Sequence, residues 1–575
     1  TDMRAELTDS RRLTGANLFW DYPSAIIDVS IDGAAEPLIG AWQRTARTLL
    51  KALGREQEQT CFRVFEGGAS LLISAAIDAL YSTCELNEVA WKCAVDQMEA
   101  GTLNKETDDL SADIKRLRTE FDAEANPALL ALQSAAAQHG VPFLWDDDEV
   151  SAGYGATACI WAADSLPAVD DVDWQSIHSI PLALVTGTNG KSTTVRMTAA
   201  IMNAAGNRAG LTSTDFIRVG DRTIDKGDYS GTGGARMLMR QGDVEMAVLE
   251  VARGGLLRRG LGVERAQAAV ITNVAADHLG EYGINTVEEL IPAKFIVHRA
   301  LKGDDPLILN ADDEGVVAFA ESIDNRLAWF SLDAGHPVIK TNLLSGGTAC
   351  YLKDGWLVAA TGGAEGQSER NMIAVKDIPP ARGGAVRYNV SNALAALSIA
   401  VSLGIPDDAV RLGLSSFKGD EHDNPGRGNW FEHNGIRILV DFAHNEHGMI
   451  ALADSVRQVD ADRVVLLMGQ AGDRLDKDIS DLTHAACSMR PDHLLISDLP
   501  GYERGREPMA VPRLIRKFAL ESGVSEESMG IFTCPKEATE RALMNARPGD
   551  LLVLLALTQR QEALALSLDY LRANG

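Results

Sequence analysis

The chain has 575 residues, of which 46% are hydrophobic and 23% are charged, a composition typical of a globular protein with several hydrophobic cores. Asp and Glu number 81 against 54 Lys and Arg, and the formal net charge of -27 argues against a general nucleic-acid binder or a membrane-surface protein, both of which need a basic field. The seven cysteines form no CxxC pair and the longest apolar run, 551–557, is too short to cross a bilayer, so we expect reduced thiols and a cytoplasmic location.

The first block of the chain shows one strand-like run followed by mostly helical patterning. Residues 25–31 are apolar, as in a buried strand. Residues 36–53 and 69–81 space their apolar side chains three and four positions apart, which predicts amphipathic helices. The acidic stretch at 169–174 is turn-like and is a candidate linker.

From residue 173 onward, short β-rich runs alternate with helical stretches in two successive blocks. In the first of these blocks, strands are predicted at 182–186, 247–251, 269–274 and 307–310. In the second block, they are predicted at 438–442, 464–469, 493–498 and 551–557. Buried strands that alternate with helices predict doubly wound, mostly parallel sheets. We therefore expect an α/β fold with three domains, residues 1–172 (α+β), 173–423 and 424–575.

The strongest chemical signal is the segment GTNGKST, Gly187 to Thr193, between a predicted strand and a predicted helix that starts at Lys191. A glycine-rich turn in this place lets backbone N–H groups and the helix N-terminus converge on phosphate oxygens. The regular pattern GxxxxGK[ST] requires Gly where this chain has Val185, so the match is incomplete. We predict that nucleotide phosphates are bound by Thr188, Asn189, Gly190, Lys191, Ser192 and Thr193.

Two downstream residues could complete a metal site with the Ser192 hydroxyl. Glu250 lies at the end of one predicted strand and His278 follows the next, and ligands bind at the carboxyl edge of such sheets. Mg²⁺ prefers a carboxylate, whereas histidine is a less usual ligand for it. Either residue alone would more often be structural. Together with the phosphate loop, they form a candidate Mg²⁺ site of Ser192, Glu250 and His278.

These residues carry a family resemblance. GTNGKST, the strand-end Glu250 and NVAADHLG at 273–280 resemble the Mur ligase family, whose members use ATP to join a carboxylate to an amine. The segment EVARGGLLRRGL at 250–261 is similar to the Mur-like half of the cyanophycin synthetase family. Further similar segments follow in the family's order: NADD (310–313), NVSNALAA (389–396), NPGR (424–427), DFAHN (441–445) and GDR (472–474). The resemblance covers about 181–510 and implies a P-loop central domain followed by a Rossmann-like C-terminal domain.

The first block resembles another part of the same family. LTGAN at 13–17 and FEGG at 65–68 are similar to the small N-terminal domain of cyanophycin synthetases, and 140–155 resembles the lead-in to their ATP-grasp domain. The chain then continues into the Mur-like part, so we expect the ATP-grasp domain to be missing. In that family, the ATP-grasp module extends the aspartate backbone and the Mur-like module adds arginine to the aspartate side chain. We expect only the second type of reaction here, with the N-terminal domain as a scaffold or an acceptor-binding surface.

The resemblance also implies how the nucleotide is held. Asn310, Asn389 and Asn392 fall where the family holds the nucleotide base, although Tyr388 stands where the family usually has histidine. Asp441 would accept hydrogen bonds from the ribose hydroxyls. Arg427, at a domain junction, would reach the γ-phosphate with its fork of donors.

The remaining implied roles concern the chemistry and the substrates. Lys294 lies where Mur ligases often have a carbamylated lysine that supports a second Mg²⁺; a solvated helix lysine is the alternative. The expected catalytic residues are Lys191, Glu250, His278, Lys294 and Arg427. The expected substrate-contacting residues are Arg253, Arg258, His444 and Asn445, of which the two arginines could instead form ordinary structural ion pairs. Because the last two lie in the third block, the site would be complete only when the two α/β domains close.

We therefore expect an ATP- and Mg²⁺-dependent ligase that acts through an acyl phosphate on a small carboxylate and an amine. The resemblance implies a homo-oligomer, and we expect no nucleic-acid or membrane partner. Two alternatives remain: an ATP-binding regulatory protein that lost the chemistry, and a ligase of the folylpolyglutamate or peptidoglycan-precursor type. The presence of Lys191, Glu250 and His278 speaks against the first, and ARGGLLRRGL at 252–261 speaks against the second.

Overall fold

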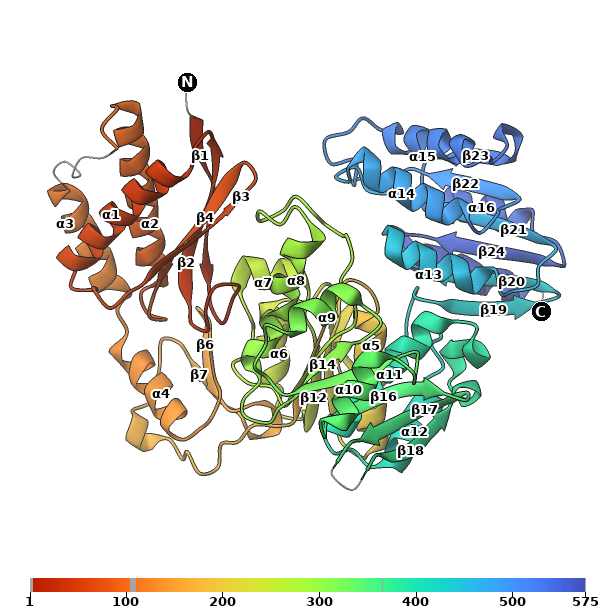
Figure 1. Cartoon of the computed structure of the whole chain (residues 1–575), viewed down its shortest axis with the longest axis horizontal. Helices are drawn as coiled ribbons and strands as arrows, with labels where there is room; N and C mark the ends of the chain where they lie inside the picture. Colours follow the sequence, from red (N-terminus) through yellow and green to blue (C-terminus); the bar gives the residue numbers. More distant parts are fainter. Residues whose placement is uncertain (1–3, 104–109, 364–365, 574–575) are drawn as a thin grey trace.

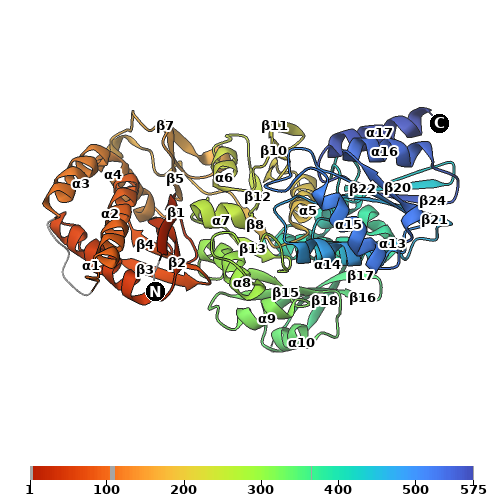
Figure 2. The ribbon, with the colours of Figure 1, turned by 90° about the horizontal axis from the view of Figure 1, so that it is seen from above.

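The computed structural model describes residues 4–103, 110–363 and 366–573, which form three regions in a row (Figure 1). The N-terminal region lies at one end, the central region in the middle and the C-terminal region at the other end, and the view from above in Figure 2 shows the same order. No helix among the described residues is both long enough and apolar enough to cross a membrane.

The N-terminal region is built on an antiparallel sheet covered by helices. The sheet has the order β1 (Arg4–Leu13), β2 (Ser24–Asp32), β4 (Gly68–Ser74) and β3 (Thr60–Phe65). The helices of the region are α1 (Glu36–Ala52), α2 (Leu80–Glu99), α3 (Ser111–Glu124) and α4 (Pro127–Gln138). The indole of Trp42 in α1 donates a 2.8 Å hydrogen bond to Asn87 in α2, which joins the two helices inside the core. A second small sheet contains β5 (Phe143–Trp145), β6 (Glu149–Ala152) and β7 (Cys159–Ala162).

One helix predicted for this region, at 69–81, was wrong. Residues 69–81 form no single helix: β4 ends at Ser74 and α2 begins at Leu80. Leu71 and Ile73 of β4 pack against the helices, while Leu72 packs in a second small core on the opposite face. A strand buried on both faces is a continuous apolar run, which also fits helical spacing. The expected strand at 25–31 and helix at 36–53 correspond to β2 and α1.

The central region contains a doubly wound, mostly parallel sheet, as predicted. Its strands are β8 (Leu182–Thr186), β9 (Ala209–Thr212), β10 (Phe216–Val219), β11 (Arg222–Lys226), β12 (Met246–Glu250), β13 (Ala268–Ile271), β14 (Leu307–Asn310), β15 (Leu327–Ser331), β16 (Thr348–Lys353), β17 (Trp356–Thr361) and β18 (Ser368–Ala374). The spatial order is β11-β10-β9-β12-β8-β13-β14-β15-β16-β17-β18, and only the outer strands at each edge are antiparallel.

Helices cover both faces of this sheet and create two cores. One face packs against α6 (Thr232–Met239), α7 (Arg253–Arg259), α8 (Val287–Phe295), α9 (Glu314–Ala320) and α10 (Pro337–Leu344). The other face packs against α5 (Lys191–Ala204), α11 (Arg387–Ser402) and α12 (Asp407–Ser416). In β8, Leu182 and Leu184 face the first core, whereas Ala183 and Val185 face the second. Burial on both faces explains why the strand is apolar throughout.

The C-terminal region repeats this architecture with six strands. Their order is β19 (Asn429–His433), β20 (Ile436–Asp441), β24 (Asp550–Leu555), β21 (Arg463–Met468), β22 (His493–Ser497) and β23 (Met529–Phe532), and only β19 is antiparallel to its neighbour. The helices are α13 (Glu446–Val456), α14 (Asp476–Cys487), α15 (Ala510–Glu521), α16 (Pro535–Met544) and α17 (Arg560–Ala573). All eight strands predicted for the last two blocks are present, with ends shifted by at most three residues.

The connection from the N-terminal to the central region is short. Residues 163–181, all of them described, join β7 directly to β8, and the acidic stretch at 169–174 lies within this connection. The two regions are also linked through α7: the amide of Thr14 donates to the carbonyl of Arg259, and that of Leu261 to Ala16, both at 2.7 Å. No further domain is inserted between them.

Candidate functional site

A cavity of about 2050 Å³ lies where the central and C-terminal regions meet. Its walls are formed by the β8–α5 loop, the ends of β12 and β14, the residues after β13, and the start of α11. The C-terminal region contributes residues that follow β20 and β24. The cavity is therefore at the carboxyl edge of the parallel strands, where ligands of such sheets bind.

The predicted phosphate loop joins β8 to α5, and α5 begins at Lys191 as expected. Gly187 has φ +143° and an added Cβ would overlap the hydroxyl of Thr272; Gly190 has φ +85° and a Cβ there would overlap the side-chain oxygen of Asn392. Both positions therefore require glycine. The hydroxyl of Thr272 donates to the carbonyl of Asn189 at 2.6 Å, which fastens the loop to the end of β13.

Two lysines lie at this loop: Lys191 is half-buried and Lys294 is buried. The Nζ of Lys191 donates to the carbonyl of Thr188 at 2.9 Å, and the Nζ of Lys294, in α8, donates to the carbonyl of Gly187 at 2.8 Å. Burial lowers the pKa of Lys191, although Glu250 opposes the shift. Burial, reinforced by the positive charge of Lys191, lowers the pKa of Lys294 well below its usual value. Because Lys294 is 4% exposed, the alternative of a solvated lysine is excluded.

Glu250 ends β12 and is 2% exposed. Its Oε2 accepts hydrogen bonds from the Ser192 hydroxyl at 2.8 Å and from the amide of Thr214 at 3.3 Å. No lysine or arginine among the described residues forms an ion pair with this carboxylate. A buried carboxylate beside a hydroxyl offers the hard oxygen ligands that Mg²⁺ prefers. The donor set of Ser192 and Glu250 therefore fits the expected metal.

His278 lies on the cavity wall within a group that includes Asp277 and His444. One potential ligand atom from each of these three residues lies within 4.8 Å of the others. Arg474 places one guanidinium nitrogen 3.1 Å from Asp277 Oδ1 and another 3.1 Å from Nε2 of His278. Burial would raise the pKa of Asp277. The hydrogen bond and charge of His444, together with the charges of His278 and Arg474, instead hold this pKa far below its usual value. Asp277 was not predicted, although it precedes His278 in the quoted motif.

The three asparagines expected near the nucleotide base also line the cavity. The amide of Asn310 donates to the carbonyl of Thr272 at 2.8 Å, and the amide of Asn392 donates to the side-chain oxygen of Asn389 at 3.2 Å. Asn389 in turn donates to the carbonyl of Pro380 at 3.0 Å. These bonds hold the wall in place.

Asp441 and Tyr388 lie on the same side of the cavity. Burial raises the pKa of Asp441, although the amides of its own loop and the charge of Arg427 oppose the shift. Among the described residues, the buried hydroxyl of Tyr388 has no hydrogen-bond partner, and its pKa is raised well above the usual value, first by burial and then by Asp441. Burial of a hydroxyl without a hydrogen-bond partner costs free energy, unless a ligand or a water molecule forms a hydrogen bond with it.

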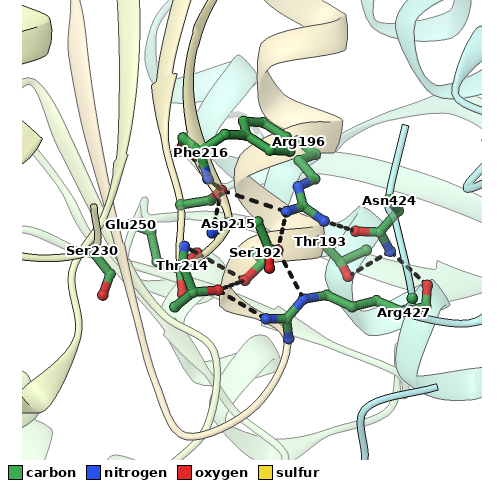
Figure 3. Close-up of polar contacts among 12 residues, drawn as sticks. Ser192, Thr193, Arg196, Thr214, Asp215, Phe216, Ser230, Glu250, Asn424 and Arg427 are labelled. Carbon is green, nitrogen blue, oxygen red and sulfur yellow. Dashed lines mark hydrogen bonds and ion pairs between the residues drawn. The ribbon is translucent and has the colours of Figure 1, made fainter. Parts of the chain in front are cut away.

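A cluster of arginines surrounds Asp215, which follows β9; Figure 3 shows Arg196 and Arg427 of this cluster. The Asp215 carboxylate lies 2.5 Å from Arg196 in α5 and 3.5 Å from Arg427, and it also pairs with Arg560 at the start of α17. Burial would raise the pKa of Asp215, but the three guanidinium groups hold it far below its usual value. Three cations on one carboxylate leave a surplus of positive charge beside the phosphate loop. Of these residues, sequence analysis found only Arg427.

Contacts of Arg427 and Asn424 extend this cluster to the phosphate loop. Arg427 donates to the hydroxyl of Thr214 at 2.8 Å. Arg196 donates to Asn424 at 2.6 Å, and Asn424 donates to the hydroxyl of Thr193 at 3.1 Å (Figure 3). Residues that precede the C-terminal sheet are thereby fixed to the first turn of α5.

The structure places the expected substrate-contacting residues in different parts of the molecule. Arg253 lines the cavity, donates to the carbonyl of His278 at 2.5 Å and pairs with Glu281. Arg258 does not line this cavity; it is exposed and lines a second hollow of about 780 Å³ between α7 and the N-terminal sheet. His444 lines the main cavity. The Asn445 and Asn189 amides exchange two hydrogen bonds of 3.0 Å, which join the C-terminal region to the phosphate loop.

Comparisons with known proteins identify two family domains in the chain. Residues 185–400 match the Mur ligase middle domain, and residues 426–556 match the Mur ligase, glutamate ligase domain. The chain is 35% identical over 375 residues to the cyanophycin synthetase of Geminocystis herdmanii (strain PCC 6308), which covers 65% of this chain and 42% of that protein. It is 25% identical over 394 residues to the UDP-N-acetylmuramoyl-L-alanyl-D-glutamate--2,6-diaminopimelate ligase of Bacillus velezensis, which covers 66% of this chain and 74% of that protein.

Among solved structures, the FolC protein of E. coli in complex with DHPP and ADP aligns with a TM-score of 0.49 at 20% identity, covering 68% of this chain and 89% of that one. The chain spans less than half of the length of the cyanophycin synthetases that it matches.

Proposed function

The chain belongs to the Mur ligase family through its middle and glutamate ligase domains, and we propose that it is an ATP-dependent ligase that joins a carboxylate to an amine. The γ-phosphoryl group of ATP would pass to the carboxylate, and the amine would displace phosphate from the acyl phosphate to form an amide. One observation supports this proposal above the others: a glycine-dependent phosphate loop, a buried carboxylate and surplus guanidinium charge line one cavity.

We propose that ATP phosphates bind at the amides of the phosphate loop and the N-terminus of α5. A positively polarised helix end and the Lys191 ammonium suit the β- and γ-phosphates. Arg427, which donates to Thr214 beside Glu250, would stabilise the charge that crowds around the transferred phosphoryl group. The base would lie near Asn310, Asn389 and Asn392, with Asp441 toward the ribose.

We propose Mg²⁺ as the metal, held by Ser192, Glu250 and His278. When bound, it would neutralise phosphate charge during transfer. Lys294 is proposed to be carbamylated, which the family resemblance suggests. Its depressed pKa supports this, because CO₂ reacts with an unprotonated amine, forming a carbamate and releasing a proton. A carbamate on Lys294 would add negative charge beside Gly187, to which this lysine now donates.

We propose that the acidic substrate lies near Arg253 and that His444 and Asn445 line the side from which the amine enters. The Asn189–Asn445 hydrogen bonds support a site that is assembled by closure of the two α/β domains. The proposed domains are residues 1–172, 173–423 and 424–575. A small product, a homo-oligomer and a cytoplasmic location belong to the same proposal, and the acidic net charge makes a nucleic-acid partner unfavourable.

A turnover assay tests this function. The protein is incubated with Mg²⁺, ATP and pooled amino acids and carboxylic acids, and the products are identified by mass spectrometry. The expected result is phosphate release that requires both a carboxylate and an amine, with a product mass equal to their sum less water. Glu250→Gln, which keeps the shape but removes the charge, should abolish product formation. ATP hydrolysis that needs neither substrate, in the wild-type protein as in the variant, would contradict the proposal.

A further inference from the structure

The loop that contains His278 has an unfavourable backbone conformation. His278 has φ 51° and Tyr282 has φ 54°, so two residues with side chains occupy the left-handed region that favours glycine. Gly280 and Gly283, between and beside them, also have positive φ values, 94° and 65°. A conformation of this kind persists only where surrounding contacts hold it.

The central region supplies one set of contacts to residues 278–284. Arg253 donates to the carbonyl of His278 at 2.5 Å and pairs with Glu281. The amide of Gly280 donates to the carbonyl of Ile284 at 2.7 Å, and the Ile284 side chain is buried in the central core. The amide of Ile284 also donates to the carbonyl of Glu281 at 3.1 Å. Among the described residues, the central region therefore provides no donor for the carbonyls of Tyr282 and Gly283.

The N-terminal region supplies the other set. Arg63, in β3, donates from Nη1 to the carbonyl of Gly283 and from Nη2 to the carbonyl of Tyr282, both at 2.8 Å. The Phe65 ring packs so closely on Gly283 that an added Cβ would overlap it. Arg11, in β1, lies 4.8 Å over the ring of Tyr282. Three side chains of one sheet therefore hold a loop that is more than 200 positions away in the sequence.

The Arg63 contact depends on the shape of the guanidinium group. Arg63 forms no ion pair among the described residues; its two terminal nitrogens are used for two consecutive carbonyl groups. A planar fork of donors matches such a pair, and the single ammonium of lysine does not. Removal of the guanidinium would leave the carbonyls of Tyr282 and Gly283 without a donor from the N-terminal region.

We propose that Arg63 is a positioning residue for His278, through which the N-terminal region holds residues 278–284 so that Asp277 and His278 face the main cavity. This inference rests on the proposed function for its link to catalysis. It gives the N-terminal region a role in the reaction without any contact with ATP, because the support acts through the backbone of residues 282–283.

The test uses the full chain with Arg63→Ala and Arg63→Lys. Arg118→Ala is the matched control, because Arg118 also donates to a backbone carbonyl of the N-terminal region, that of Ala52, at 2.6 Å and away from the loop. Amide hydrogen exchange of residues 278–284 and Mn²⁺ affinity in the presence of ADP are measured without turnover. Thermal unfolding shows whether each variant is folded.

Both Arg63 variants should show faster exchange at residues 278–284 and about 10- to 100-fold weaker Mn²⁺ binding, the usual effect of losing a residue that supports a metal ligand. Arg118→Ala should match the wild type. In turnover, kcat should fall more than the KM for ATP rises. Unchanged exchange and Mn²⁺ affinity in a folded Arg63→Ala protein would overturn the proposal. If instead the wild type forms no amide while the exchange and Mn²⁺ results hold, the ligase proposal fails and the positioning role stands.

Discussion

Replacement of Asp215 by asparagine tests the electrostatics of the arginine cluster. The substitution keeps the size of the side chain but removes the one negative charge that Arg196, Arg427 and Arg560 share. The Arg196 side chain is 2% exposed, so its charge cannot be solvated in the variant. Arg427 and Arg560 are about one-fifth exposed and can regain part of their hydration.

The expected loss follows from this burial. Removing one partner of a buried ion pair costs about 3–5 kcal/mol, because the remaining charge stays desolvated. We expect Asp215→Asn to lower the free energy of unfolding by this amount and to reduce ligase turnover, since Arg427 loses its orientation. Asp243→Asn is the control: Asp243 pairs with Arg222 at 2.7 Å and with Arg208 at 3.7 Å, but both arginines are exposed. Exposed pairs contribute about 0–1 kcal/mol.

Urea unfolding of the three proteins, followed between pH 3 and pH 8, measures the effect. Because the pKa of Asp215 is held below that of the unfolded chain, about 3.9, its stabilisation is complete above that value and is lost only as the pH falls further. The difference between wild type and Asp215→Asn should therefore be constant from pH 5 to pH 8 and shrink below pH 4. A loss no larger than that of Asp243→Asn, or one that disappears between pH 5 and pH 8, would refute the reasoning.

Two further substitutions test the phosphate loop and the lysine beside it. Gly190→Ala should weaken ADP binding at least about tenfold in a calorimetric titration and lower the free energy of unfolding by about 1–3 kcal/mol. The reason is that residue 190 has φ +85° and the new Cβ would overlap the side chain of Asn392. An unchanged ADP affinity would contradict the assignment of this loop to phosphate binding. In CO₂-free buffer, Lys294→Met should raise the free energy of unfolding at pH 7 by about 1 kcal/mol or more, since burial makes the pKa of Lys294 lower in the fold than in the unfolded chain, and such a lysine destabilises the fold below its unfolded pKa. This advantage should shrink as the pH rises toward about 10.4, and a difference that grows with pH would show that Lys294 is charged in the fold.

The sequence predicted the parts of the fold that have local signatures. The strands of the two α/β regions are apolar because both faces are buried, and the phosphate loop is a short glycine-dependent turn, so each is visible in a few consecutive residues. In contrast, β1 was missed because most of its residues are exposed or half-buried, which removes the apolar pattern. The strand β4 was taken for a helix because it is apolar on both faces.

The parts of the site that were missed depend on long-range contacts. Asp215 and Arg560 are 345 positions apart, and their pairing appears only when the C-terminal region folds against the central region. Arg253 and Arg258 seemed equivalent in sequence, but five residues correspond to about 140° around a helix, so their side chains point to different faces of α7. The result is that Arg253 lines the main cavity and Arg258 the second hollow.

The most direct test of the central claim follows an oxygen atom from the acid to the phosphate. The carboxylic acid substrate is labelled with oxygen-18 in its carboxyl group and incubated with the protein, Mg²⁺, ATP and the amine, and the released phosphate is analysed by mass spectrometry. An acyl phosphate requires that one labelled oxygen leaves with the phosphate as the amide forms. We predict one oxygen-18 in each phosphate, and none with Glu250→Gln. Unlabelled phosphate released together with an amide product would contradict the proposed mechanism.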